Sequence, residues 1–119
     1  MVKKLFLTAL IVLILDQLTK FILKGNINTG IAFSLFQGYN LIFIFIAIIV
    51  ILVILYYRNH PQQFSIGLLL GGTTSNLIDR IIHGGVIDFI HLIYWNTNIA
   101  DFANVIGGFL LIKYFWQND

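Results

Sequence analysis

The sequence predicts an all-α integral membrane protein with four transmembrane helices, both termini in the cytoplasm and a polar site near the outer face. Hydrophobic residues make up 59% of the 119 residues and charged residues only 10%, whereas soluble domains carry about 25% charged residues. The mean hydropathy is +0.92. Apolar runs long enough to cross a membrane alternate with short polar segments. We therefore expect a single membrane domain over residues 1–119, with lipid as its solvent.

The first helix is expected over residues 4–23. Its start is similar to a secretory signal peptide, but no small-residue cleavage site follows, and the apolar run continues through the segment DQLTK. Asp16 and Lys20 share a helix face, with the acid before the base, which is the favourable order for an ion pair. We expect this pair to tie the helix to a polar cluster.

The second helix, expected over residues 39–57, is almost purely apolar and is bounded by tyrosines. It is long enough for a hydrocarbon core of about 30 Å. Before it lie a loop rich in Asn and Gly, residues 24–30, and an apolar segment, residues 31–36, that is too short to span. We expect that segment to be re-entrant or interfacial.

The third helix is expected over residues 62–82, after the turn 58–61 that holds the only proline. Three glycines on this helix should allow close helix packing; they are Gly67, Gly71 and Gly72. A polar stripe at positions 72, 75/76, 79/80 and 83 follows the helical repeat. The segment His83-Gly84-Gly85 should end the helix.

The fourth helix is expected over residues 99–116, after a connection, residues 86–98, whose aromatic residues suit the membrane interface. These aromatic residues are Phe89, Tyr94 and Trp95. Asp101, Asn104 and Gly108 fall on one face of the helix.

The basic residues indicate the topology. Four of them, Lys3, Lys4, Arg58 and Lys113, fall at one end of the four helices, which the positive-inside rule makes cytoplasmic. The net charge of +2 forms no basic stripe, so nucleic acid is not an expected partner. The chain has no cysteine, which excludes disulfides and cysteine nucleophiles. A polar group then gathers near the outer face: Asp16, Asn28, Asn76, Asp79, Arg80, Asp88 and Asp101.

Asp88 and Asp101 are the candidates for the chemistry. A short polar segment, Asn96-Thr97-Asn98, separates them and can bring the second carboxylate to face the first. Two carboxylates held close cannot both ionise, so one keeps a proton. The charged one can take a proton from water while the other donates to a peptide carbonyl, which is the chemistry of aspartic proteases.

Structural alternatives remain open for the same residues. Asp101 can cap a helix N-terminus, and Asp88 can pair with His91. Asp79 and Arg80 can form an internally neutralised pair, or Arg80 and Asn76 can donate to a substrate backbone. A metal site built from His83, Asp88, His91 and Asp101 matches no known ligand spacing. Ser75 lies in no nucleophile-elbow motif.

Two other functions compete with a peptidase. One is a small proton- or ion-coupled transporter that uses the aspartates as a relay, and the other is a non-catalytic membrane assembly partner. A transporter should carry polar groups through the full depth of the membrane. The interior of the second helix and the inner half of the fourth carry few, which favours a site at one face.

Five motifs resemble the lipoprotein signal peptidase (signal peptidase II) family and follow the family's order. They are Asp16-Gln17-Leu18-Thr19-Lys20 (DQxTK), Asn28-Thr29-Gly30-Ile31-Ala32-Phe33 (NxGxAF), Gly71-Gly72 through Asn76, Asp79 and Arg80 (GGxxxNxxDR), Val86-Ile87-Asp88-Phe89 (VxDF) and Asn98-Ile99-Ala100-Asp101 (NxAD). Each motif alone is a weak signal, but five in order on a four-helix membrane chain are a strong one.

The resemblance implies a membrane aspartic endopeptidase that removes the signal peptide from bacterial prolipoproteins, cutting before a cysteine that carries a diacylglyceryl group. It implies a multi-pass protein of the bacterial inner membrane with its active site toward the extracytoplasmic face. The family's catalytic aspartates correspond to Asp88 and Asp101. No metal or organic cofactor is expected. The expected partners are the lipid-modified prolipoprotein, membrane lipid and globomycin-type inhibitors.

The resemblance also assigns the surrounding residues. The family's residues around the substrate and the cyclic peptide antibiotic globomycin correspond to Asn28, Asn76 and Arg80, and we expect Asn98 to join them. We expect Asp16, Lys20 and Asp79 to form a structural polar cluster.

The chain departs from the family's pattern in three places. Only residues 21–27 separate the first two motifs, where family members have a longer segment that builds an extracytoplasmic β-structured platform. The bridge from Asp88 to Asp101 is short, and Phe102 stands where a serine often follows. No catalytic group is lost, so we expect a short or divergent member.

Overall fold

A computed structural model describes residues 2–31, 35–92 and 95–118. It contains four helices, each within one residue of the expected bounds. The helices are α1 (Lys3–Leu23), α2 (Asn40–Tyr56), α3 (Gln63–His83) and α4 (Ile99–Gln117). Within the apolar segment 31–36, positions 32–34 lie outside the described residues, as does Tyr94 of the bridge. Ile31 and Leu35 form an isolated antiparallel bridge.

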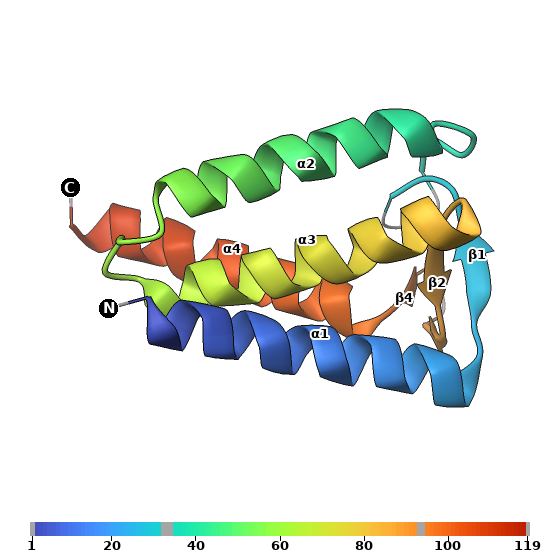
Figure 1. The fold of residues 1–119 in the computed structure, drawn as a ribbon, viewed down its shortest axis with the longest axis horizontal. Helices are drawn as coiled ribbons and strands as arrows, with labels where there is room; N and C mark the ends of the chain where they lie inside the picture. The colour runs from blue at the N-terminus through green and yellow to red at the C-terminus, as the bar shows by residue number, and fades with distance from the viewer. Residues whose placement is uncertain (1, 32–34, 93–94, 119) are drawn as a thin grey trace.

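The four helices lie side by side, with both chain termini and the α2–α3 turn at one end and the strands at the other (Figure 1). Lys3, Arg58 and Lys113 therefore belong to the end that lacks the strands. The polar motifs of the sequence gather at the opposite end, which we call the strand end.

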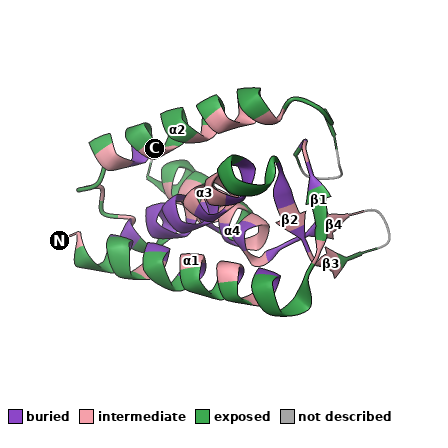
Figure 2. Cartoon of the chain, turned by 45° about the vertical axis from the view of Figure 1, so that its right-hand side comes forward, coloured by how far each residue is buried: buried purple, intermediate pink, exposed green. Residues whose placement is uncertain are grey.

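Helix α3 is the centre of the bundle and packs against each of the other three helices (Figure 2). The glycines predicted to allow close packing do so. A Cβ at Gly71 would lie 2.6 Å from the carbonyl oxygen of Ala9 in α1, and one at Gly72 would lie 2.6 Å from that of Ala100 in α4. On α4, the glycine packed against α3 is Gly107, whereas Gly108 faces open space.

The distribution of burial is inverted relative to a soluble protein. Among the described residues, the largest fully buried side chains are Leu5 and seven polar ones: Asn98, Thr97, Asp16, Asp79, Asp88, Ser65 and Ser75. Large apolar side chains cover the outside, such as Leu41 at 65% and Leu52 at 61% exposure. A polar interior beneath an apolar surface is the arrangement expected when lipid surrounds the protein.

Two of the helices, α1 and α4, have the length and hydropathy of a membrane span, and α2 is apolar but shorter, with 17 residues. Helix α3 has 21 residues but carries the polar stripe. Gly84, with φ of +75°, ends α3 in the left-handed conformation, as the sequence predicts.

The expectation of an all-α fold is wrong in one respect, because two small sheets cover the strand end. Strand β1 (Asn26–Asn28) pairs antiparallel with β2 (Val86–Asp88), in the register Asn26↔Asp88 and Asn28↔Val86. Strand β3 (Ile90–His91) pairs with β4 (Asn96–Thr97). Strands of two or three residues are too short to show an alternating pattern in the sequence. The short segment after α1 thus still supplies one strand.

Candidate active site

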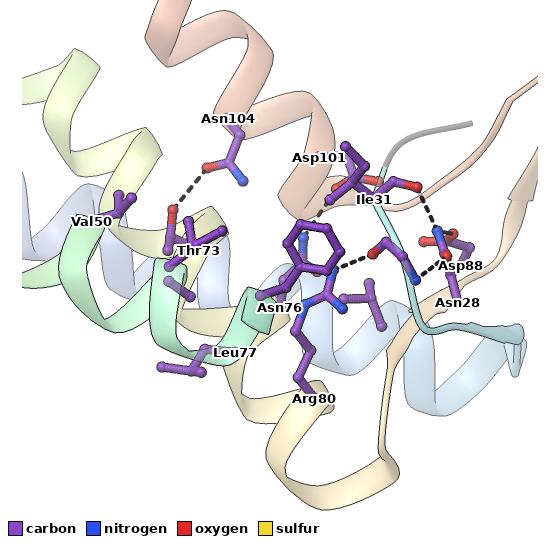
Figure 3. Close-up of a pocket in the computed structure, with 15 residues that line it drawn as sticks. Asn28, Ile31, Val50, Thr73, Asn76, Leu77, Arg80, Asp88, Asp101 and Asn104 are labelled. Carbon is purple, nitrogen blue, oxygen red and sulfur yellow. Dashed lines mark hydrogen bonds between the residues drawn. The ribbon is translucent and has the colours of Figure 1, made fainter. Parts of the chain in front are cut away.

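Asp88 and Asp101 line one cavity of about 240 Å³ at the strand end of the bundle (Figure 3). Its walls come from α2, α3, the start of α4 and the loop after β1. The lining residues are Asn28, Gly30, Ile31, Phe43, Ile46, Ala47, Val50, Thr73, Asn76, Leu77, Arg80, Val86, Asp88, Asp101 and Asn104. Polar groups occupy the strand end of this cavity, and apolar side chains of α2 face them.

Asp88 is the last residue of β2 and is 1% exposed. Each carboxylate oxygen accepts one amide hydrogen bond, Oδ2 from Asn28 at 3.1 Å and Oδ1 from Asn98 at 2.9 Å. Burial raises the pKa of Asp88 to about 6, and the negative charge of Asp101 adds to this rise, while the two amide donors oppose it. Asp88 therefore holds a proton to a higher pH than an ordinary aspartate does.

Asp101 lies in the first turn of α4, and it does not cap the helix itself. The N-cap is Asn98, whose Oδ1 accepts the backbone N–H of Asp101 at 2.8 Å. The Asp101 carboxylate accepts hydrogen bonds from Asn76 at 3.0 Å and from the Thr97 hydroxyl at 3.0 Å. The positive end of the helix dipole favours a negative charge in this turn, which suits an ionised Asp101.

Asn98, expected at the substrate, has a different position. It is fully buried, and it does not belong to the residues that line the cavity. Besides its bonds to Asp88 and Asp101, its amide donates to the carbonyl oxygen of Ile87 at 3.1 Å. Its side chain thus joins Asp88 to the backbone of Asp101 from outside the cavity lining.

Asn28, at the end of β1, lines the cavity and connects Asp88 to the loop that follows. Its Nδ2 donates to Asp88 and to the carbonyl oxygen of Ile31 at 3.0 Å, and its Oδ1 accepts from Gln37 at 2.6 Å. No sequence pattern pointed to Gln37. The side-chain amide of Asn28 therefore contacts both the loop and the carboxylate of Asp88.

Arg80 lines the cavity from α3, but the predicted Asp79–Arg80 pair is wrong. In the described part of the chain, the Arg80 guanidinium donates to the carbonyl oxygens of Thr29 and Gly30 and to Oδ1 of Asn40. It also lies over the ring of Phe43, 5.1 Å from the centroid. Residues 79 and 80 are adjacent, so they point to different sides of the helix. Arg80 joins the loop to α2.

Asp79 pairs with Lys20 instead, at 2.7 Å, and Lys20 also contacts Asp16 at 2.5 Å. All three side chains are at most 2% exposed. The structure thus brings Asp16, Lys20 and Asp79 into one buried cluster, behind the cavity wall. Gln17 and Ser75, which the sequence did not single out as partners, complete it, since Gln17 donates to Asp79 and Ser75 to Asp16.

Three alternatives from the sequence do not fit this geometry. His91 contacts Asn96 at 3.0 Å rather than pairing with Asp88. Ser75 is fully buried and donates to Asp16, away from the cavity, so it is unsuited to be a nucleophile. Among residues 2–31, 35–92 and 95–118, no group of three acidic or histidine side chains could hold a metal ion.

A second, apolar cavity of about 620 Å³ lies among α2, α3 and α4, toward the end that carries the termini. It is lined by Ile49, Val50, Val53, Ile54, Tyr57, His60, Ile66, Leu69, Leu111 and Phe115. Val50 lines both cavities. The face of α2 from Phe43 to Tyr57, about 21 Å of helix, therefore runs along both.

Comparison with known proteins identifies a family model and relatives that carry the same description. The family model described as Signal peptidase (SPase) II, Peptidase_A8, matches residues 8–117. A lipoprotein signal peptidase of Halothermothrix orenii is 34% identical over 139 residues, covering 96% of this chain and 96% of that protein. One from Listeria monocytogenes serotype 4a is 34% identical over 144 residues, covering 96% of this chain and 94% of that protein.

Two solved structures share the fold. Both are described as bacterial membrane enzymes. One has a TM-score of 0.87 and 29% sequence identity, covering 96% of this chain and 88% of that chain. The other has a TM-score of 0.79 and 26% identity, covering 97% and 94%.

Proposed function

Because this chain belongs to the signal peptidase II family and is a lipoprotein signal peptidase of the aspartic class, we propose that Asp88 and Asp101 are its catalytic pair. The observation that carries the proposal is their shared cavity, where each carboxylate is fixed by neutral amide or hydroxyl donors. Such donors orient a carboxylate without neutralising it, so both remain available for proton transfer.

The proposed reaction begins with Asp88 protonated and Asp101 ionised. Asp101 takes a proton from a water molecule, the water oxygen attacks the peptide carbonyl carbon, and Asp88 gives its proton to the carbonyl oxygen. In the resulting diol, one hydroxyl returns its proton to Asp88 as the C–N bond breaks. The proton on Asp101 passes to the leaving nitrogen, which restores both groups. General acid–base assistance of this kind contributes about 10²–10⁴-fold.

Three further residues shape the proposed substrate site. Asn28 and Asn76 each line the cavity and donate to one catalytic carboxylate. Arg80 holds the loop at Thr29 and Gly30, which places that loop over the aspartates. We assign Arg80 to the shape of the substrate cleft, and to the binding of globomycin-type inhibitors there.

The substrate we propose is a bacterial prolipoprotein with a diacylglyceryl group on the cysteine after the cut. The apolar cavity supports this choice, since it continues the catalytic cavity at Val50. Its volume of about 620 Å³ takes about twenty groups the size of a water molecule. This volume is enough for an acyl chain. A peptide helix about 10 Å wide fills roughly 400 Å³ per turn, so the cavity suits an acyl chain better than a helix.

The protein is a bacterial membrane enzyme with helices long enough to span a membrane. We propose that all four helices cross the inner membrane, with the strand end extracytoplasmic. The basic residues at the other end, among them Arg58, support this orientation. A reporter fused at Arg58 should remain cytoplasmic, and its export would mean the inverse topology. Family membership decides against the transporter and the assembly partner.

The deciding experiment measures cleavage of a diacylglyceryl-modified prolipoprotein by a gel-shift assay. Asp88→Asn and Asp101→Asn should each abolish cleavage while the protein still inserts and folds. The matched control is Asp119→Asn at the chain's end, which should cleave normally. Normal turnover by either active-site variant would contradict the assigned pair.

A further inference from the structure

The backbone of each catalytic aspartate is held at the residue directly before it. Asp16 in α1 accepts the N–H of Ala100 at 2.9 Å, and Asp79 in α3 accepts the N–H of Ile87 at 3.1 Å. Asp101 follows Ala100, and β2 ends one residue after Ile87. Two buried carboxylates outside the catalytic pair thus fix the peptides from which the pair projects.

Lys20 joins these two carboxylates. Its Nζ lies 2.5 Å from Asp16 and 2.7 Å from Asp79, in surroundings where all three side chains are at most 2% exposed. Two carboxylates in such a place repel each other strongly unless a cation lies between them. Lys20 is therefore the charged link between the two backbone anchors, beside the neutral link through Gln17 and Ser75.

The third contact of Lys20 reaches the catalytic pair. Nζ donates to Oδ1 of Asn76 at 3.0 Å, and Nδ2 of Asn76 donates to Asp101 at 3.0 Å. An ammonium group can only donate, so it requires the oxygen of the Asn76 amide to face it. The NH₂ group is then turned toward the Asp101 carboxylate, which can only accept when ionised.

We propose that Lys20 is a positioning residue for the catalytic pair, fixing its spacing through Asp16 and Asp79 and its hydrogen bonding through Asn76. This inference rests on the proposed function of Asp88 and Asp101. It goes beyond a structural ion pair, because loss of Lys20 should change the chemical step and its pH dependence as well as stability.

The pH dependence follows from the charges that surround Asp88. They are Asp101 on α4, Lys20 on α1 and Arg80 on α3, while Asp16 on α1 and Asp79 on α3 lie against Lys20. The positive charge of Lys20 favours the ionised form of Asp88 and opposes the rise of its pKa. Removing that charge raises the pKa of Asp88 further, so Asp88 keeps its proton to a higher pH.

The test measures kcat and KM against pH for the full-length protein and a diacylglyceryl-modified prolipoprotein. The variants are Lys20→Met, Asn76→Ala and the two combined. Lys20→Met should lower kcat about 10²-fold, the effect of a small misplacement of reacting groups, with KM within about threefold. The alkaline limb of kcat/KM should move to higher pH. The combined variant should lose little more than the worse single one, since the two residues act in series.

Lys24→Met is the matched control, because Lys24 directly follows α1 and is exposed; its kinetics should match the wild type. If Lys20→Met does not fold, the double variant Lys20→Met/Asp79→Asn takes its place. The two substitutions together leave the net charge of the cluster unchanged. An unchanged kcat in the folded variant would overturn the positioning role. So would losses that multiply in the combined variant. Absence of cleavage by the wild type would count against the proposed function instead.

Discussion

The side-chain amide of Asn98 donates a hydrogen bond to Oδ1 of Asp88 at 2.9 Å. The oxygen of the same amide accepts the backbone N–H of Asp101 at 2.8 Å and caps α4. One fully buried side chain therefore connects the end of β2 to the start of α4. The NxAD motif thus supplies both one of the two proposed catalytic carboxylates and the side chain that connects it to the other.

We expect Asn98→Asp to separate these two tasks. The new carboxylate still accepts the N–H of Asp101, so the cap is retained, but it cannot donate to Asp88 and repels it. The kcat should fall at least about 10²-fold, and the protein should also lose stability, because the new carboxylate is buried beside Asp88; Asn98→Ala instead loses the cap, worth about 1 kcal/mol. Cleavage assays and thermal unfolding of both variants check this. A normal kcat in Asn98→Asp would show that the bond to Asp88 is dispensable.

The pH dependence of the free enzyme follows from Asp88. Its pKa is raised to about 6 by burial and by the charge of Asp101. The proposed mechanism needs a proton on Asp88, and Asp88 loses that proton as the pH rises through about 6. We therefore expect kcat/KM to fall as pH rises through about 6, which reports on the free enzyme. Rates between about pH 5 and pH 8 test this, with thermal unfolding showing that the protein stays folded. A rate that rises across this range would refute the assignment.

Replacing Arg80 with lysine should weaken the substrate cleft although the charge is kept. Arg80 contacts Thr29, Gly30 and Asn40 at once, and an ammonium group cannot reproduce a planar guanidinium with several fixed donors. Arg80→Lys should lower globomycin affinity and kcat/KM about tenfold, in line with the loss of roughly one charge-assisted hydrogen bond. Arg58→Lys, at the end that lacks the strands, is the control. Equal affinity in both variants would argue against this role of Arg80.

Filling the apolar cavity should affect long acyl chains selectively. Val53 lines that cavity, whereas its neighbour Leu52 does not. Val53→Trp should raise KM several-fold for a substrate with hexadecanoyl chains and leave one with short acyl chains unaffected, because only the long chain reaches the added ring. Leu52→Trp should change neither value. Competition assays in bilayers provide the measurement, and equal effects on both substrates would exclude the cavity as an acyl site.

Helices α3 and α4 pack so closely at Gly72 that we expect no side chain to be tolerated at this position. A Cβ there would lie 2.6 Å from the carbonyl oxygen of Ala100, directly before Asp101. We expect Gly72→Ala to move the start of α4, lowering kcat and costing about 1–3 kcal/mol through overpacking. Gly108→Ala is the matched control on α4, since nothing lies within 4 Å of its Cβ. Thermal unfolding and cleavage rates distinguish the two; an unchanged Gly72→Ala would mean that the helices can separate without effect.

The sequence predicted the helices because their signals are local. Apolar runs of span length indicate where the helices lie, and Gly84 and Gly85 indicate where α3 ends. The strands were missed because strands of two or three residues form only when distant partners pair, as Asn26 does with Asp88. The spacing of polar residues along α3 likewise predicted that Asp79 belongs to a polar face of the helix. It did not predict which cation forms an ion pair with Asp79.

By itself, the sequence determined the helical membrane architecture, the family and the two candidate catalytic aspartates, because hydropathy and motif order are properties of the chain. Only the tertiary structure decided the partners: Lys20 rather than Arg80 for Asp79, and both Asp88 and the backbone of Asp101 for Asn98. A buried polar group must find a partner within hydrogen-bond distance, and which partner lies there depends on how helices far apart in sequence pack together.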